Sequence, residues 1–240
     1  DVIPIGYQYC LSSRFNAMLT ADADAYHKWL AQNGLDVPNF PISLFAISNF
    51  YIPKIIVNDD RLQICVPRIQ FLPEVNTLEF LNQSFLDKEL VIGDDFTSVH
   101  FKIVAIDEVS PVDFNPVMEY QTLSPIVIKA LRSNNTLEYL APNNQFFAEF
   151  MIDELIERWQ ALYQCPYNGS RMFRFRLLAP ERRKSVKVMD AQGNEVKVVG
   201  YMMKFRLEMA PELHEIAYIM GLGDEINSGF GYIELIKKRR

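Results

Sequence analysis

The stretch GLGDEINSGFG, residues 221–231, places four of the ten glycines of this 240-residue chain within eleven residues. Apolar side chains at helical spacing precede it from Pro211, and the strand-like run GFGYIELI overlaps its end. A dinucleotide-binding loop needs the reverse order, a strand before it and a helix after it, and no Gly-Lys-Ser/Thr of a Walker loop follows. Two interpretations remain. The bare backbone either lets a phosphodiester chain approach closely, or it only makes a tight connection.

The elements upstream of this loop complete a recognisable order. Strands are predicted at 117–131, at RMFRFRLL (171–178), and at 184–189 and 195–209 on either side of the turn DAQGN; helices are predicted at 145–163 and from Pro211 to a stop at Gly221. The order β-α-β-β-α-β is ferredoxin-like, an antiparallel sheet with two helices on one face.

The first half reads as a second, less complete copy. Helices are predicted at 7–19, at 22–33 with Asp22 as N-cap and Gly34 as stop, and at 77–86 with Asn76 as cap; strands are predicted at 43–50, 62–69, 88–92 and 99–106. An opening strand before Tyr7 is missing, and we expect it upstream of Asp1 or supplied otherwise. The predicted fold class is therefore α+β, with two tandem ferredoxin-like (RRM-like) domains at 1–112 and 117–240 and a boundary in EVSPVDFNP, 108–116.

Charge is distributed unevenly along the chain. The net charge is -6, yet the segment from Arg171 to Arg206 carries a local +7. Such a patch on an otherwise acidic protein is typical of a site for a polyanion. A solvated hairpin that keeps a sheet edge soluble explains the same residues equally well.

Cysteines and histidines give no sign of a metal or disulfide site. The three cysteines, Cys10, Cys65 and Cys165, are far apart without a Cys-x-x-Cys pair, which favours a reducing cytoplasm. His100 and His214 are expected to be structural, and no histidines have metal-ligand spacing. We therefore predict a cytoplasmic protein with no metal and no cofactor. No apolar run is long enough for a membrane span, so no membrane partner is expected.

Four stretches together resemble a known family. They are IPIGYQYCLSSRFNAML (3–19), SLFAISNF (43–50), YQTLSPIVI (120–128) and GLGDEINSGFG. They look like the CRISPR-associated endoribonucleases of the repeat-associated mysterious protein (RAMP) superfamily, which process repeat RNA and consist of two ferredoxin-like domains. The resemblance implies that repeat RNA is held by the basic hairpin and the glycine loop. The residues implied are Arg174, Arg176, Arg182, Arg183, Lys184, Lys187, Lys197, Lys204, Arg206, Gly221, Gly223, Asn227, Ser228, Gly229 and Gly231.

The resemblance also implies a reaction. Family members cut RNA without a metal, because the ribose 2′-OH attacks the adjacent phosphate and leaves a 2′,3′-cyclic phosphate and a 5′-OH. This chemistry needs a base, an acid and positive charge at the phosphate. Many relatives carry a tyrosine near the end of the first helix and a histidine in the second, where this chain has Asn16 and Ala31.

The predicted catalytic residues are the nearest substitutes for that pair. His27 lies one helical turn before the alanine, with Tyr26 and Lys28 beside it and Lys54 as further positive charge. The alternative is that His27 is only a surface residue next to a packed Trp29.

Three functions therefore remain open. The first is a metal-independent endoribonuclease, and the second is a repeat-RNA binding protein that does not cut. The third is a structural RAMP subunit of an effector complex. The implied partners are CRISPR repeat RNA, a second copy of the chain, and a CRISPR effector complex.

Overall fold

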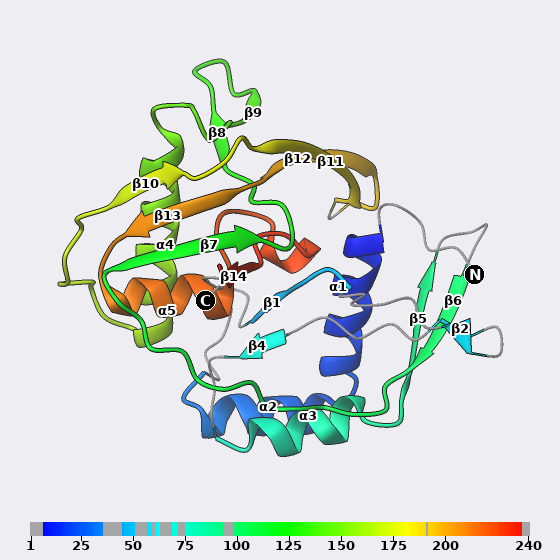
Figure 1. Cartoon of the computed structure of the whole chain (residues 1–240). Coiled ribbons are helices and arrows are strands. Elements are labelled where there is room, and N and C mark those ends of the chain that lie inside the picture. Colours follow the sequence, from blue (N-terminus) through cyan, green and yellow to red (C-terminus); the bar gives the residue numbers. More distant parts are fainter. Residues whose placement is uncertain are drawn as a thin grey trace.

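A four-stranded antiparallel sheet forms the centre of the C-terminal half of the computed structural model (Figure 1). Its strands lie in the order β10-β13-β7-β14, so the first strand of this half lies between the third and the fourth. This is the ferredoxin-like order, and the predicted β-α-β-β-α-β sequence of elements is confirmed. The bounds are β7 Val117–Thr122, α4 Phe147–Tyr163, β10 Arg174–Leu177, β13 Lys204–Glu208, α5 Pro211–Met220 and β14 Ile233–Leu235.

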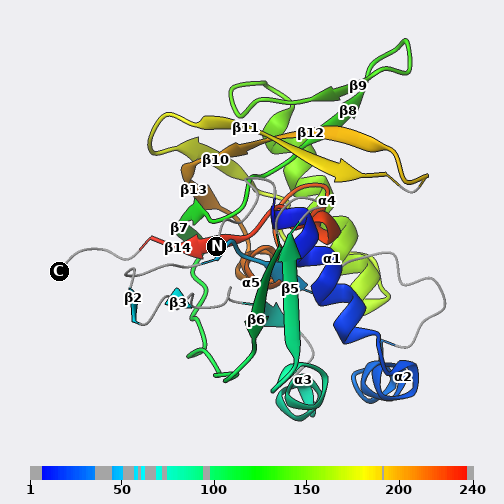
Figure 2. The same ribbon diagram turned by 90° about the vertical axis from the view of Figure 1, so that its right-hand side faces the viewer.

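Two additional strand pairs are inserted into this frame. They are β8 Lys129–Leu131 with β9 Leu137–Tyr139, and β11 Arg182–Met189 with β12 Glu195–Met202. Figures 1 and 2 show both hairpins on the same side of the molecule, above the central sheet. The second pair is the predicted basic hairpin, which therefore stands as a sheet of its own.

Among the residues that the structure describes, the N-terminal half holds three helices and three antiparallel strand pairs. The described residues are 7–35, 45–50, 57–58, 61–62, 69–71, 75–93, 98–190 and 192–236. The elements are α1 Tyr7–Leu19, α2 Ala23–Gln32, β1 Phe45–Ile47 with β4 Ile69–Phe71, β2 Val57–Asn58 with β3 Arg61–Leu62, α3 Thr77–Phe85, and β5 Glu89–Gly93 with β6 Ser98–Lys102. No helix in these ranges is both long and apolar enough to cross a membrane.

The helix signals in this half were read correctly with one exception. Asp22 caps α2 by accepting a hydrogen bond from the backbone N–H of Ala25 at 3.0 Å, and Gly34 follows the helix with φ +69°. Asn76 is the N-cap residue of α3, as predicted, but its backbone is left-handed and its side chain makes no capping hydrogen bond; the side chain donates to Gln32 instead. The opening strand before residue 7 and most of the predicted strand 62–69 lie outside the described residues.

Two predicted strands are each divided in the structure. The run 117–131 is β7 and then β8, because the chain leaves the sheet at Pro125, which has no N–H for a ladder hydrogen bond. The run 195–209 is β12 and then β13, which belong to different sheets. Residues 103–116 contain neither helix nor strand, and the predicted domain boundary within them stays a prediction.

Apolar residues at the expected spacing form the core of the C-terminal half. On the sheet, Phe205 and Leu207 of β13 point to the same face as Tyr120 of β7, and all three are fully buried. Phe147 and Leu155 of α4 pack against them together with the apolar stripe of α5. Both helices therefore cover one face, and the opposite face carries the alternating polar side chains.

A buried histidine lies within this core. His214, in the first turn of α5, is fully buried, and its Nδ1 accepts a hydrogen bond from the hydroxyl of Tyr120 at 2.9 Å. Its Nε2–H donates to the carbonyl of Pro116 at 3.3 Å. Burial lowers the pKa of His214 to about 4, so the native state holds the neutral ring. The role is structural, as expected.

Because His214 is buried in its neutral form, we expect the folded protein to lose stability in acid. In the unfolded chain His214 takes up a proton near its ordinary pKa of 6.5, whereas the native state resists protonation down to about 4. Stability is therefore complete above pH 6.5 and decreases as the pH falls towards 4, by on the order of 2 to 3 kcal/mol at pH 4.5. Urea unfolding at pH 7 and pH 4.5 measures this loss. His214→Gln, which can make both hydrogen bonds but does not titrate, should lose less stability between the two pH values; an equal loss would contradict the assignment.

Candidate nucleic-acid interface

The cations of the β11-β12 hairpin are exposed, and its valines are buried. Val186, Val188 and Val198 are buried on the inner face against Val127 and Phe230. Five cations of the hairpin are exposed: Arg182, Arg183, Lys184, Lys187 and Lys197. Arg183, Lys187 and Lys197 lie on the face opposite the buried valines, whereas Arg182 and Lys184 alternate in phase with Val186 and lie beyond the buried part of that face. Among the described residues, Lys187 alone of these five forms an ion pair, with Glu195 at 2.7 Å. The hairpin thus presents positive charge that is largely uncompensated.

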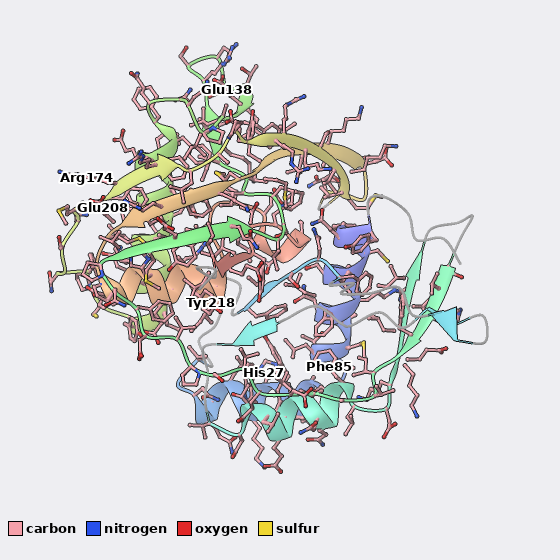
Figure 3. The ribbon with its side chains drawn as sticks, in the orientation of Figure 1. His27, Phe85, Glu138, Arg174, Glu208 and Tyr218 are labelled. Carbon is pink, nitrogen blue, oxygen red and sulfur yellow. The ribbon has the colours of Figure 1, made fainter. Side chains whose placement is uncertain are left out.

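The open face of the central sheet carries four more of the predicted cations, two in ion pairs and two without an ion pair within the described residue ranges. Arg206 of β13 donates to Glu119 of the neighbouring β7 at 2.6 Å, and Arg174 of β10 lies 3.5 Å from Glu208 (Figure 3). Two further cations, Arg176 and Lys204, are exposed and have no ion-pair partner in the described part of the chain. The β10 side of the sheet is therefore the more positive side, and it adjoins the hairpin.

A hollow of about 450 Å³ lies where this positive surface meets the N-terminal half. Its wall combines an aromatic ring, amide and hydroxyl groups and two cations, contributed by Asn49, Phe50, Gln121, Thr122, Leu123, Ala179, Pro180, Arg182, Met202, Met203 and Lys204. Phe50 is held in place because its ring stacks on Tyr7 at 4.9 Å and its backbone N–H donates to the hydroxyl of that tyrosine. Such a mixture suits a nucleotide, which has an apolar base with polar edges and an anionic phosphate.

The glycine loop is packed inside the protein. Gly221, Gly223, Gly229 and Gly231 are all buried and all have φ between +78° and +89°. A methyl group on Gly223 would overlap the carbonyl oxygen of Val127. Gly221 ends α5 with φ 83° and ψ 173°, a conformation essentially restricted to glycine. Internal packing alone accounts for these glycines, as the tight-connection interpretation requires, and their contact with RNA stays a prediction.

A buried arginine holds the loop in this position. Arg158 of α4 is only 6% exposed, and its guanidinium donates to the carbonyl oxygens of Gly221, at 2.7 Å, and Gly223. Glu154, one turn earlier, lies 3.4 Å away. Burial lowers the pKa of Arg158. Sequence reasoning missed this residue, although it falls on the apolar stripe of its own helix, where a charge needs an explanation.

Four residues of the loop reach the surface. Asp224 and Glu225 are partly exposed, and Asn227, which is exposed, and Ser228, which is partly exposed, lie in the short 3-10 turn Ile226–Ser228. The carbonyl of Asn227 accepts a hydrogen bond from the hydroxyl of Ser12 on α1 at 2.7 Å. The turn is thereby fixed against the N-terminal half.

The predicted catalytic residues lie far from this interface. His27 and Lys28 are exposed on α2, and Tyr26 packs on Trp29 and Phe80. Figures 1 and 2 both show α2 at the bottom of the molecule and the β11-β12 hairpin at the top, and Figure 3 labels His27 at that lower end. The structure thus brings the predicted RNA-binding cations together but separates them from the predicted catalytic group.

The other titratable groups do not change this picture. His100 is exposed on β6, where its Nδ1 lies 2.8 Å from Glu89. In the described ranges, no three side chains of His, Cys, Asp or Glu are grouped so that they could hold a metal ion. Lys54 lies outside the described residues.

Comparisons with known proteins agree with the fold. A family model described as CRISPR associated protein Cas6, C-terminal, matches residues 109–235. A solved structure of a Cas6-related protein from Pyrococcus furiosus has 20% identity and a TM-score of 0.72, covering 100% of this chain and 94% of its own. Another, of CRISPR associated protein Cas6, has 22% identity, a TM-score of 0.72 and coverage of 99% and 94%.

A third solved structure, described as a RAMP protein binding different RNA substrates, has 19% identity and a TM-score of 0.72, with coverage of 98% of this chain and 94% of its own. No curated protein matches the sequence. The shared fold confirms the predicted α+β class with tandem ferredoxin-like domains.

The packing of the loop predicts that replacing two different glycines by alanine reduces folding stability by unequal amounts. Gly223→Ala adds a methyl group that overlaps a carbonyl at φ +79°, whereas Gly193→Ala, in the turn of the basic hairpin at φ +81°, meets no atom within 4 Å. Both substitutions lose about 1 to 2 kcal/mol of stability, because alanine is unfavourable in a left-handed backbone conformation. Gly223→Ala should lose at least about 2 kcal/mol more, measured as the free energy of unfolding in urea. Equal losses would mean that the loop is not packed as described.

Proposed function

The chain belongs to the CRISPR-associated Cas6 family, and from this premise we propose that it binds CRISPR repeat RNA and cuts precursor CRISPR RNA without a metal ion. The observation that carries the proposal is the exposed, mostly unpaired positive charge of the β11-β12 hairpin on a protein of net charge -6. A cationic strip attracts the phosphate backbone of RNA even on a protein with a negative net charge, because the charges closest to the phosphates dominate the interaction.

The arrangement of the strip supports an RNA path. It runs from Arg176 on the sheet, past Lys204 and Arg182 at the hollow, and on to Arg183 and Lys184 of the hairpin. Phosphates would follow the cations, and the hollow would take a single unstacked base against Phe50 and the amides beside it. The partners proposed with this path are repeat RNA first, and then a second copy of the chain or an effector complex that receives the product.

The proposed reaction is attack by a ribose 2′-OH on the adjacent phosphate. A base removes the 2′ proton, an acid protonates the departing 5′ oxygen, and a cation stabilises the phosphate in the transition state. The products are a 2′,3′-cyclic phosphate and a 5′-OH. His27 with Lys28 and Tyr26 supplies these roles only if the RNA extends around the N-terminal half to α2.

A second candidate function is RNA binding without cleavage. It is favoured by Asn16 and Ala31, which occupy the positions where many relatives have tyrosine and histidine, and by the distance of α2 from the hairpin (Figure 1). In this case the chain would hold repeat RNA and pass it on.

The electrostatic role of the hairpin is testable by salt dependence. Arg183→Gln/Lys184→Gln should weaken binding of the repeat RNA and lower the slope of log K against log salt by about 1.4, since each contact with a single strand contributes about 0.7. Lys88→Gln/Lys102→Gln removes the same charge from the N-terminal half and is the matched control. Fluorescence anisotropy between about 50 and about 200 mM salt measures both slopes. Identical slopes for the two variants would remove the hairpin from the RNA path.

Cleavage separates the two candidate functions. The wild-type chain is incubated in EDTA with a labelled transcript of the CRISPR repeat from its own genome, and the ends of the products are identified. We expect a 2′,3′-cyclic phosphate and a 5′-OH, and no cleavage of the same RNA with 2′-deoxy sugars, because the attacking hydroxyl is then absent. Tight binding with no cut would establish the second candidate.

A further inference from the structure

We propose that Lys129, Tyr139 and Glu225 form the cleavage centre for RNA held by the β11-β12 hairpin. The inference rests on the proposed function, because it assigns the residues that carry out the proposed reaction. The chain has three histidines. His214 is fully buried, His100 lies on β6 with Glu89, and His27 lies at the opposite end from the hairpin.

The three residues come together from two separate segments. Lys129 of β8 and Tyr139 of β9 are directly opposite each other in the antiparallel pair, so their side chains share one face. Glu225 comes from the glycine loop, and its Oε1 lies 2.7 Å from Nζ of Lys129. The loop also fixes the backbone of Lys129, because the carboxylate of Asp224 accepts a hydrogen bond from its N–H at 2.6 Å.

The cluster lies directly beside the basic hairpin. The hydroxyl of Tyr139 donates to the backbone carbonyl of Lys197 on β12 at 3.3 Å, and its ring packs against the buried valines of the hairpin. Figures 1 and 2 both place the β8-β9 pair next to β11-β12. A phosphate bound along this side of the hairpin would therefore pass within reach of the cluster.

The side chains are accessible but partly desolvated. Lys129 is 28% exposed and Glu225 is 26% exposed, while Tyr139 is partly buried. A ligand can reach such groups, and their charges are screened less than those of fully exposed residues. Surface ion pairs that only add solubility do not need this degree of burial.

The protonation states suit an acid, a base and a cation. Burial raises the pKa of Tyr139, and Glu225 and Asp224 add to this, although Lys129 opposes it, so the hydroxyl keeps its proton at neutral pH. Burial disfavours the charge of Lys129, but the hydrogen bond and charge of Glu225 outweigh burial and raise its pKa, so the ammonium remains charged. Tyr139 can then act only as the acid, and a carboxylate is the remaining group able to accept a proton.

A carboxylate in this position is held by two donors and keeps room for a third. One oxygen of Glu225 meets the ammonium of Lys129, and the other accepts a hydrogen bond from the hydroxyl of Ser228 at 3.0 Å. Each carboxylate oxygen has two lone pairs, so one pair on each remains available for the 2′ proton. Ser228 is a positioning residue, because it acts on the carboxylate and not on the RNA.

The step is balanced in atoms and charge. The 2′ oxygen forms a bond to phosphorus while the bond from phosphorus to the 5′ oxygen breaks. Glu225 takes the 2′ proton, Tyr139 gives its proton to the 5′ oxygen, and the ammonium of Lys129 stabilises the negative phosphate oxygens. Afterwards water takes the proton from the glutamic acid and returns one to the tyrosinate, so no cofactor is consumed.

Tyr139→Phe and Glu225→Gln test the assignment. Both variants preserve shape, and a side-chain amide can still hydrogen-bond to Lys129 and Ser228. The cleavage rate is measured in EDTA at saturating protein in a single turnover with the repeat transcript, and affinity is measured with its uncleavable 2′-deoxy form. We expect each variant to cut at least about 100-fold more slowly, with an affinity within about twofold of wild type, because acid-base groups contribute about 10² to 10⁴ to rates. Tyr167→Phe is the matched control. It also removes a hydrogen-bonded phenol, whose hydroxyl lies 3.0 Å from the carboxylate of Glu212 and 3.1 Å from the carbonyl oxygen of Ser170.

Each other outcome overturns the inference. If rate, affinity and melting temperature fall in parallel, the cluster only connects β8 to the glycine loop. If both variants cut at the wild-type rate, or if His27→Ala alone abolishes cleavage, the centre lies elsewhere while the proposed function stands. If the wild-type chain binds the transcript but does not cut it, the proposed cleavage fails, and this centre fails with it.

Discussion

The fork of hydrogen bonds from Arg158 to the carbonyl oxygens of Gly221 and Gly223 determines where the glycine loop lies. Removing a guanidinium from water is expensive, and the two carbonyls with the nearby Glu154 offset that cost. Because the loop is held there, the carbonyl of Asn227 can accept a hydrogen bond from the hydroxyl of Ser12 on α1. The joint between the two halves of the chain, and the surface that lies across it, therefore depend on one buried cation.

Local periodicity was enough to predict most of the fold. The helix bounds 7–19 and the ferredoxin-like order of the second half follow from apolar spacing and from glycine and aspartate signals. The division of 117–131 and 195–209 into separate strands was not predictable in the same way. Which sheet a residue joins depends on a partner far away in the sequence. Apolar residues continue at every second position from Val199 to Met209, so the pattern does not mark Met203, where the chain passes from one sheet to the next.

The candidate site was predictable only where it depends on local pattern. The uneven charge along the chain indicated a basic hairpin, and its cations, including Lys187 and Lys197, are exposed in the structure. The relation of His27 to that hairpin depends on how two distant segments pack, and a one-turn argument within α2 carries no information about it. The pairing of Lys129 with Glu225 spans the same kind of distance, so the ion pair became visible only in the folded chain.

The order of strands in the central sheet also has a consequence for synthesis. β7, Val117–Thr122, is the first strand of its domain to leave the ribosome, yet both of its neighbours, β13 and β14, come much later. Its two edges therefore stay unpaired until residues 204–208 and then 233–235 have been made. Such non-local pairing slows folding and leaves strand edges open to other chains. In a nascent copy of this protein, β7 therefore keeps one edge available to other chains until the last strand has been made.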